Sequence, residues 1–218
     1  MSDAAPASPR LPRAVRIAAI LCLLSAAATG LPSASEAMAL TRFEELREAT
    51  LKLEPAPWFG DPALARKALE ARFFALESMR DARILTLGLL SLACAFTGVA
   101  AARILRPGGL PREGMRKLLS AAAIATAVLR TVDGAQWAVV ARRMGEAMAR
   151  GLTLQPPVRT AEELAQVKEA LPGIMLGGTV LWTFLIVGLF MGLSQYFRSA
   201  HVRALLGSPP PRSTRELR

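Results

Sequence analysis

Four long stretches almost free of charged residues are the feature that most constrains this chain. They lie at 17–35, 83–105, 118–141 and 173–197. Each has about the 20 residues that an α-helix needs to cross about 30 Å of hydrocarbon. Lipid offers no hydrogen-bond partner to the backbone, so a spanning segment satisfies its own peptide groups as a helix. We therefore predict an all-α polytopic membrane protein with four transmembrane helices in a bundle and helical extensions on the exterior side.

The first of these stretches has two interpretations. Arginines precede it, its core is apolar, and the small residues Ala37 and Ala39 follow it, a pattern typical of a cleaved signal peptide. Cleavage would leave three spans. The apolar run is longer than usual for a signal peptide, and an amphipathic stretch continues it. We therefore favour a retained signal-anchor helix at 17–35.

The net charge of +10 is concentrated in three segments. Residues 1–16 carry +2, and residues 103–117 and 198–218 carry +4 each, whereas the connections 32–83 and 142–172 together sum to zero. Alternating basic and neutral connections follow the positive-inside rule. The rule places the N-terminal tail 1–16, the loop 106–117 and a disordered tail 198–218 in the cytoplasm. Abundant alanine and arginine favour a GC-rich bacterial genome, and hence an inner membrane.

The first exterior segment, 36–82, predicts a helical hairpin. Leu40, Phe43 and Leu46 share one face of a helix over 36–54, and Phe73 and Leu76 share one face of a helix over 62–82. Because residues 63–83 contain no glycine or proline, the second helix is expected to continue without a break into the span 83–105.

The turn of this hairpin reads "EPAPWFGDP". Trp58 and Phe59 have no place there on a helix face. They are candidates for contact with a partner, or for insertion among lipid head groups, where aromatic side chains are common.

The second exterior segment, 142–172, predicts a helix-turn-helix. The third span runs on to Gly151, and Thr160 with Glu163 forms a capping box that starts a short helix. That helix is expected to end near residue 171, with a kink at Pro172 before the fourth span.

The fourth span carries glycines on one helical face. Gly173, Gly177, Gly188 and Gly192 fall within a narrow arc and predict a groove that another helix can approach closely. The neighbour is either another span of this chain, which we favour, or a second copy.

Two opposite charges interrupt the third span. Arg130 and Asp133 share a helical strip with Thr126 and Trp137, and Gln136 lies beside it. A charge in the middle of a span is costly unless it is paired and faces the protein interior. We predict that the pair is interior, and either fixes the rotation of the helix or forms a proton- or anion-responsive site.

The residues that catalysis or cofactors require are scarce. The single histidine is His201 in the C-terminal tail, which excludes haem or zinc held by facing histidines. The glycines of "RPGGLPREG" lack the lysine and hydroxyl of a phosphate loop. The spans contain serine but no lysine, so a Ser–Lys pair cannot form there. We therefore expect no enzyme, no metal and no cofactor.

These features leave three candidate functions. The basic loops lack the aromatic residues of a nucleic-acid interface, so we expect the lipid bilayer, a membrane-protein partner or a second copy as partners, and no nucleic acid. We favour a structural, accessory or sensing subunit whose exterior helices contact a partner. The alternative is an oligomeric small transporter or channel subunit that uses Arg130 and Asp133. An enzyme comes third.

The charge distribution predicts the outcome of a labelling experiment. Single cysteines introduced near Arg10, Gly109 and Ser208 should all react with a membrane-impermeant reagent only after the cytoplasmic face is opened. The physical reason is that all three lie in the basic segments. Labelling of the Gly109 position from the exterior would contradict this topology.

Overall fold

The structure is a computed structural model, and it describes residues 11–53, 62–106, 112–152 and 160–207. Within these ranges every regular element is an α-helix. The helices, in chain order, are α1 (Arg13–Thr41), α2 (Phe43–Lys52), α3 (Pro62–Glu77), α4 (Arg80–Leu105), α5 (Arg112–Gly151), α6 (Ala161–Arg198) and α7 (Ala200–Gly207). Trp58 and Phe59 lie outside the described residues.

Four of these helices, α1, α4, α5 and α6, are long and apolar enough to cross a membrane. This finding confirms the predicted all-helical class and indicates a membrane protein. The helices differ in how far they are covered by the rest of the chain. In the most apolar part of each, 33–44% of the residues of α1, α4 and α5 are buried, but only 6% of those of α6.

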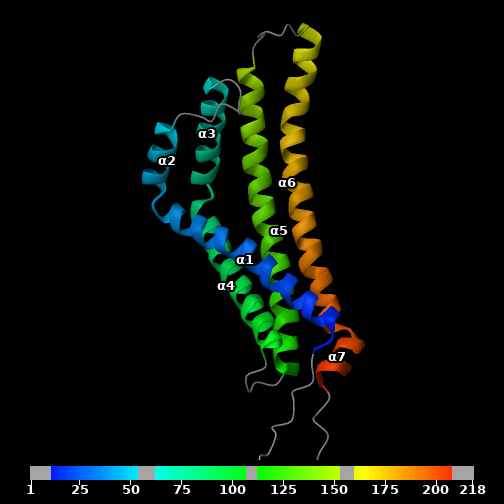
Figure 1. The fold of residues 1–218 in the computed structure, drawn as a ribbon. Coiled ribbons are helices and arrows are strands. Elements are labelled where there is room, and N and C mark those ends of the chain that lie inside the picture. Colours follow the sequence, from blue (N-terminus) through cyan, green and yellow to red (C-terminus); the bar gives the residue numbers. More distant parts are fainter. Residues whose placement is uncertain (1–10, 54–61, 107–111, 153–159, 208–218) are drawn as a thin grey trace, which may run out of the picture.

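The packing order explains this difference (Figure 1). Helix α6 lies along α5, α4 also packs on α5, and α1 crosses α4. The shorter α2 and α3 lie beside the far half of α5, and α7 lies at the other end. Helix α6 thus has one main neighbour, and most of its surface faces away from the chain.

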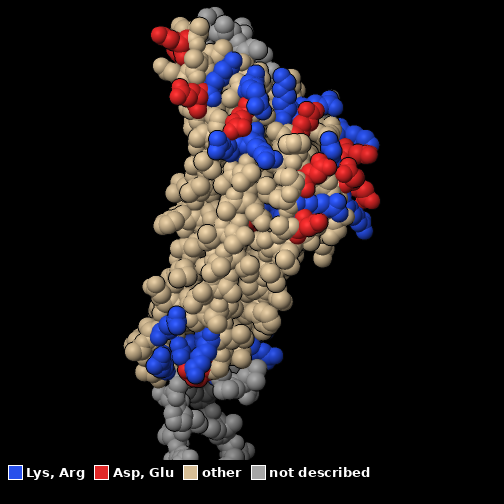
Figure 2. All heavy atoms as spheres, turned by 180° about the vertical axis from the view of Figure 1, so that it is seen from behind, with Lys and Arg blue, Asp and Glu red and all other residues tan. Residues whose placement is uncertain are grey.

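Charged side chains gather at the two ends of the molecule (Figure 2). Lys and Arg dominate one end, Lys, Arg, Asp and Glu mix at the other, and few charges show on the surface between them. An uncharged belt between polar ends is the surface that a membrane-spanning protein presents to lipid.

The core of the predicted hairpin forms as the apolar stripes indicated. Leu40, Phe43, Phe73 and Leu76 are all buried and belong to one cluster, and Leu46 packs against it. The rings of Phe43 and Phe73 meet edge to face with their centroids 5.9 Å apart, a favourable aromatic geometry. The stripe prediction for these residues is confirmed.

The expected continuous helix from 62 into the second span is wrong. Helix α3 ends at Glu77 and α4 begins at Arg80, with Met79 between them at φ −124° and ψ 14°. Tertiary packing explains the break, because Leu76 and Met79 turn into the cluster around Phe43. The break lets α3 lie on α5 while α4 follows α1.

The expectation of a disordered tail is wrong for residues 200–207. They form α7, whose Val202 and Leu206 are buried against Val15, Leu119 and Phe197. Val202 and Leu206 are four residues apart and share one helical face, so this part of the basic segment packs back on the bundle. A count of charges does not detect this spacing.

Helix α6 begins as predicted but does not end where expected. The Glu163 amide donates to the Thr160 hydroxyl at 3.2 Å, and the Thr160 amide donates to the Glu163 carboxylate at 3.0 Å, which confirms the capping box. Pro172 lies inside one uninterrupted helix rather than between two. A proline removes only one backbone donor, and the adjacent α5 supports this part of α6.

The glycines that permit close helix contact are not the four that were predicted. A Cβ placed on Gly173, Gly177, Gly188 or Gly192 would meet nothing within 4 Å. The prediction that this face packs on another span of the same chain is therefore wrong. The close approaches occur instead at Gly134 against Thr183, Gly145 against Pro172, and Gly30 against Cys94.

Adjacent phenylalanines in α3 offer a matched test of the core. Phe73 is 2% exposed and Phe74 is 70% exposed. Phe73→Ala should lower the free energy of unfolding by about 3–5 kcal/mol, because it opens a cavity in the cluster around Phe43. Phe74→Ala should change it by less than about 0.5 kcal/mol. Thermal or denaturant unfolding in detergent measures both, and equal values would show that this cluster is not a stabilising core.

Candidate functional site

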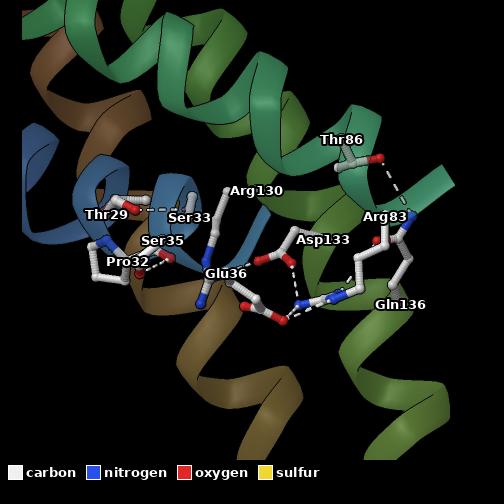
Figure 3. A network of polar contacts seen from close by, with 10 residues as sticks. All are labelled: Thr29, Pro32, Ser33, Ser35, Glu36, Arg83, Thr86, Arg130, Asp133 and Gln136. Atoms are coloured by element: carbon white, nitrogen blue, oxygen red, sulfur yellow. Dashed lines mark hydrogen bonds and ion pairs between the residues drawn. The ribbon is translucent and has the colours of Figure 1, made fainter. Parts of the chain in front are cut away.

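A network of charged and polar side chains connects α1, α4 and α5 (Figure 3). Glu36 comes from the C-terminal part of α1, Arg83 from the first turn of α4, and Arg130 and Asp133 from the middle of α5. Gln136 follows one turn further along α5. Three helices that are distant in sequence thus bring four charges together.

The predicted pair forms one side of this network. A guanidinium nitrogen of Arg130 contacts a carboxylate oxygen of Asp133, one turn apart on α5. The side chain of Asp133 is 1% exposed and that of Arg130 is 16% exposed. Arg130 Nε is buried and makes no hydrogen bond within the described part of the chain. Arg130 is therefore held by Asp133 at one end only.

Arg83 is the central residue of the network and was not predicted from the sequence. Its side chain is fully buried. Nε and Nη2 both donate to Glu36 Oε1, at 3.0 and 2.8 Å, and Nη2 lies 3.2 Å from Asp133 Oδ1. Nη1 donates to the Gln136 side-chain oxygen at 3.4 Å. One guanidinium therefore binds two carboxylates on two other helices.

A second layer of contacts holds Gln136 and Arg83 in place. The Gln136 amide nitrogen donates to the Thr86 hydroxyl at 3.3 Å, and that hydroxyl donates to the Ala82 carbonyl oxygen at 2.8 Å. The amide group of Gln136 is thus oriented by α4, with its oxygen toward Arg83. An amide is suited to this position because it offers an acceptor to Arg83 and a donor to Thr86 at the same time.

Trp137 covers the network on the side of α3. The Arg83 guanidinium carbon lies 4.7 Å from the centre of the Trp137 ring, and that of Arg72 lies 5.4 Å from it. Cations over an aromatic face are stabilised by the ring quadrupole. Burial lowers the pKa of Arg72, and the carboxylate of Glu36 acts in the opposite direction. Arg72 keeps its charge, because the ordinary pKa of arginine lies far above neutral.

The charges in the network balance. Arg83 and Arg130 oppose Glu36 and Asp133, so the four side chains sum to zero. An unpaired charge in the middle of a membrane helix costs about 2.5–3.5 kcal/mol on insertion scales. Mutual pairing removes most of this cost, which allows four charges to lie close to the apolar belt.

A crevice of about 390 Å³ adjoins the network. Its charged wall consists of Glu36, Arg130 and Asp133. The remaining residues that line it come from α1, α4 and α6, and are Ser25, Ala28, Thr29, Pro32, Ser33, Leu87, Trp182, Ile186, Leu189 and Phe190. The two most exposed charges, Arg130 and Glu36, are therefore the ones that a bound molecule can reach.

The other predicted site residues lie at different places. Thr126 is fully buried one turn below Arg130, and its side chain lies beside Cys94 of α4. The glycines Gly173, Gly177, Gly188 and Gly192 are exposed on α6. Within the described ranges, no three His, Cys, Asp or Glu residues are grouped as a metal ion requires.

The sequence contained a signal for the two missed residues. Glu36 directly follows the first predicted span, and Arg83 opens the second. Consecutive spans are antiparallel, so these ends meet on the same side of the membrane. Opposite charges at neighbouring span ends predict a pair, whereas the helical strip through Arg130 and Asp133 identifies only partners within one helix.

Comparison of the chain with protein-family models, curated proteins and solved structures finds no match.

The network predicts the effect of neutralising its buried acid. Asp133→Asn should lower the free energy of unfolding by roughly 3–5 kcal/mol, because it leaves Arg130 without an ionised partner. Glu146→Gln removes the partner of Arg142 in an exposed pair with a 3.0 Å contact. This control should cost less than about 1 kcal/mol. Unfolding in detergent, followed by helical circular dichroism, measures both changes.

A double variant tests whether Arg130 and Asp133 stabilise the fold as a pair. Arg130→Gln combined with Asp133→Asn should recover part of the stability, because neither charge is then left alone. A double variant less stable than both single variants would contradict the pairing.

Proposed function

We propose that this chain is a non-catalytic membrane subunit whose exterior helices bind a partner, either as an accessory subunit or as a sensor. The observation that carries the proposal is Phe74, a large aromatic side chain that is 70% exposed outside the predicted spans. It lines a hollow of about 620 Å³. Exposed aromatic residues set among arginines are typical of the centres of protein interfaces.

The charges around Phe74 indicate the chemistry of the partner. Arg47 of α2, Lys67 of α3 and Arg150 of α5 line the hollow, and Glu70 is the one acidic residue there. The guanidinium carbon of Arg143 lies 5.7 Å from the centre of the Phe74 ring. A partner segment with acidic side chains around an apolar one fits this surface.

The charge pattern supports an orientation. We propose that the strongly basic end, with α7, the end of α4 and the start of α5, faces the cytoplasm of a bacterial inner membrane, and that α2, α3, the end of α5 and the start of α6 face the periplasm. In this proposal the four apolar helices form the membrane bundle, and the exterior segments are 36–82 and 142–172.

Helix α6 supports a partner within the membrane as well. Its glycine face, with Gly177 and Gly188, has open space in front of it. A helix of a second copy or of another membrane protein can approach glycines closely. This contact would place the accessory subunit alongside its partner in the bilayer.

A transporter or channel subunit is the second candidate, favoured by the partial exposure of Arg130 to the crevice. Apolar residues lie on the cytoplasmic side of Arg130, where Ala123, Ala127 and Phe190 form a cluster. A polar path through one chain therefore stops at this level, and transport would require an oligomer.

The partner proposal is tested by affinity capture from gently solubilised membranes. Wild-type protein should retain a stoichiometric partner. Phe74→Ala should weaken retention about tenfold or more, because truncation of a central aromatic residue typically costs about 2 kcal/mol or more. Arg150→Glu should weaken retention of the partner more at low salt than at high salt, because the contact is electrostatic.

Met38→Ala is the matched control, since Met38 is 72% exposed and does not line the hollow. It should leave retention unchanged. Equal loss with Met38→Ala and Phe74→Ala, or no loss with either, would contradict a docking site at Phe74.

A further inference from the structure

The crevice beside the charge network has an unusual position between two helices. Helix α1 packs on α4 and α6 packs on α5, but α1 and α6 touch each other only marginally. Leu87, Arg130 and Asp133 form the floor between them. The crevice therefore connects the charge network with the apolar belt that faces lipid.

Three charged residues line the crevice, and two of them, one of each sign, are partly exposed to it. Glu36 and Arg130 keep 27% and 16% of their side-chain exposure, whereas Asp133 is sealed and Arg83 does not line the crevice. Ser25, Thr29 and Ser33 follow one another at four-residue spacing along α1 on the same wall. A molecule in this crevice meets a carboxylate, a guanidinium and a row of hydroxyls.

The opposite wall is apolar. Trp182, Ile186, Leu189 and Phe190 of α6 recur at the spacing of one helical face. Such a wall suits a hydrocarbon chain, which would leave the crevice toward the lipid. The occupant is therefore amphipathic, with a polar head at Glu36 and Arg130 and an apolar tail along α6.

Charge balance decides between a zwitterionic head and an anionic one. The charged side chains that line the crevice are the carboxylates Glu36 and Asp133 and the guanidinium Arg130, so an anion would meet more negative than positive charge in a site of low polarity. A head that carries both a phosphate and an ammonium adds none. Arg130 is suited to the phosphate, and Glu36 is suited to an ammonium that has N–H donors.

We propose that this crevice is a binding site for a zwitterionic phospholipid with a primary ammonium in its head group. The phosphate lies at Arg130, the ammonium lies at Glu36, and one acyl chain lies against Trp182 and Ile186. A quaternary ammonium head lacks the N–H donors for Glu36, and a glycerol head lacks the balancing charge. The site is independent of the partner surface around Phe74.

Lipid competition followed by native mass spectrometry tests this site. The full chain is purified in detergent and offered an equimolar mixture of phosphatidylethanolamine, phosphatidylcholine and phosphatidylglycerol with identical acyl chains. One phosphatidylethanolamine should be retained at least fivefold in excess of either other lipid. Equal retention of the three lipids, or preference for phosphatidylglycerol, would overturn the proposal.

Two substitutions fill the crevice from opposite walls without altering a charge. Ala28→Phe acts from α1 and Leu189→Trp acts from α6, since both residues line the crevice. Each should reduce retained phosphatidylethanolamine at least tenfold. Ala125→Phe, on an exposed position of α5 that does not line the crevice, should leave retention unchanged. Helical circular dichroism and gel filtration identify variants that fold, and retention unchanged in both folded crevice variants would refute the site.

A soluble competitor distinguishes the lipid from its head group. Glycerophosphoethanolamine carries the same phosphate and ammonium without acyl chains. At concentrations equal to that of the lipid it should not displace bound phosphatidylethanolamine, because it makes no contact with the apolar wall. Displacement at equal concentration would show a site for a soluble head group and would overturn the assignment of an amphiphile.

Discussion

The arrangement of α1, α4 and α5 depends on the burial of one guanidinium group. Arg83 has no exposed side-chain surface, and its partners Glu36 and Asp133 belong to two other helices. A buried cation is tolerated only where fixed acceptors surround it. These acceptors exist only when the three helices stand at this register, so a shift of any one by a single turn would leave a charge unpaired. The network therefore disfavours other arrangements of the three helices, whereas helix surfaces of alanine and leucine alone would permit many arrangements.

The break at Met79 changes the direction of the chain between two sets of packing partners. Phe73 and Leu76 of α3 and Leu87 of α4 belong to one apolar cluster, which they share with Phe43. Helix α3 packs on α5, whereas α4 packs on α1 as well as on α5. The interruption between α3 and α4 therefore lets α4 follow α1 while α3 stays beside α5.

The sequence predicted the parts of this structure that rest on composition and periodicity, and it missed those that rest on contacts between helices. Long uncharged runs predict helices because a helix lets such a segment satisfy its own backbone hydrogen bonds in lipid, and the spacing of Leu40 and Phe43 predicts a buried face. Arg130 and Asp133 were found because they are close in sequence. Arg83 and Glu36, 47 residues apart, were missed because nothing local distinguishes a buried charge at a span end from a solvated one. The charge count likewise concealed Val202, which is buried in α7 within a basic segment.

The glycines explain why a crevice exists at all. Gly134 and Gly145 of α5 bring α6 close to α5, because a Cβ on either glycine would collide with Thr183 or Pro172. Gly30 brings α1 close to α4 in the same way, against Cys94. Each close contact draws its helix toward a different partner, and α1 and α6 are left with little contact between them. The space that opens between α1 and α6 lies at the level of Arg130, so the same close packing that seals Asp133 leaves its partner within reach of a ligand.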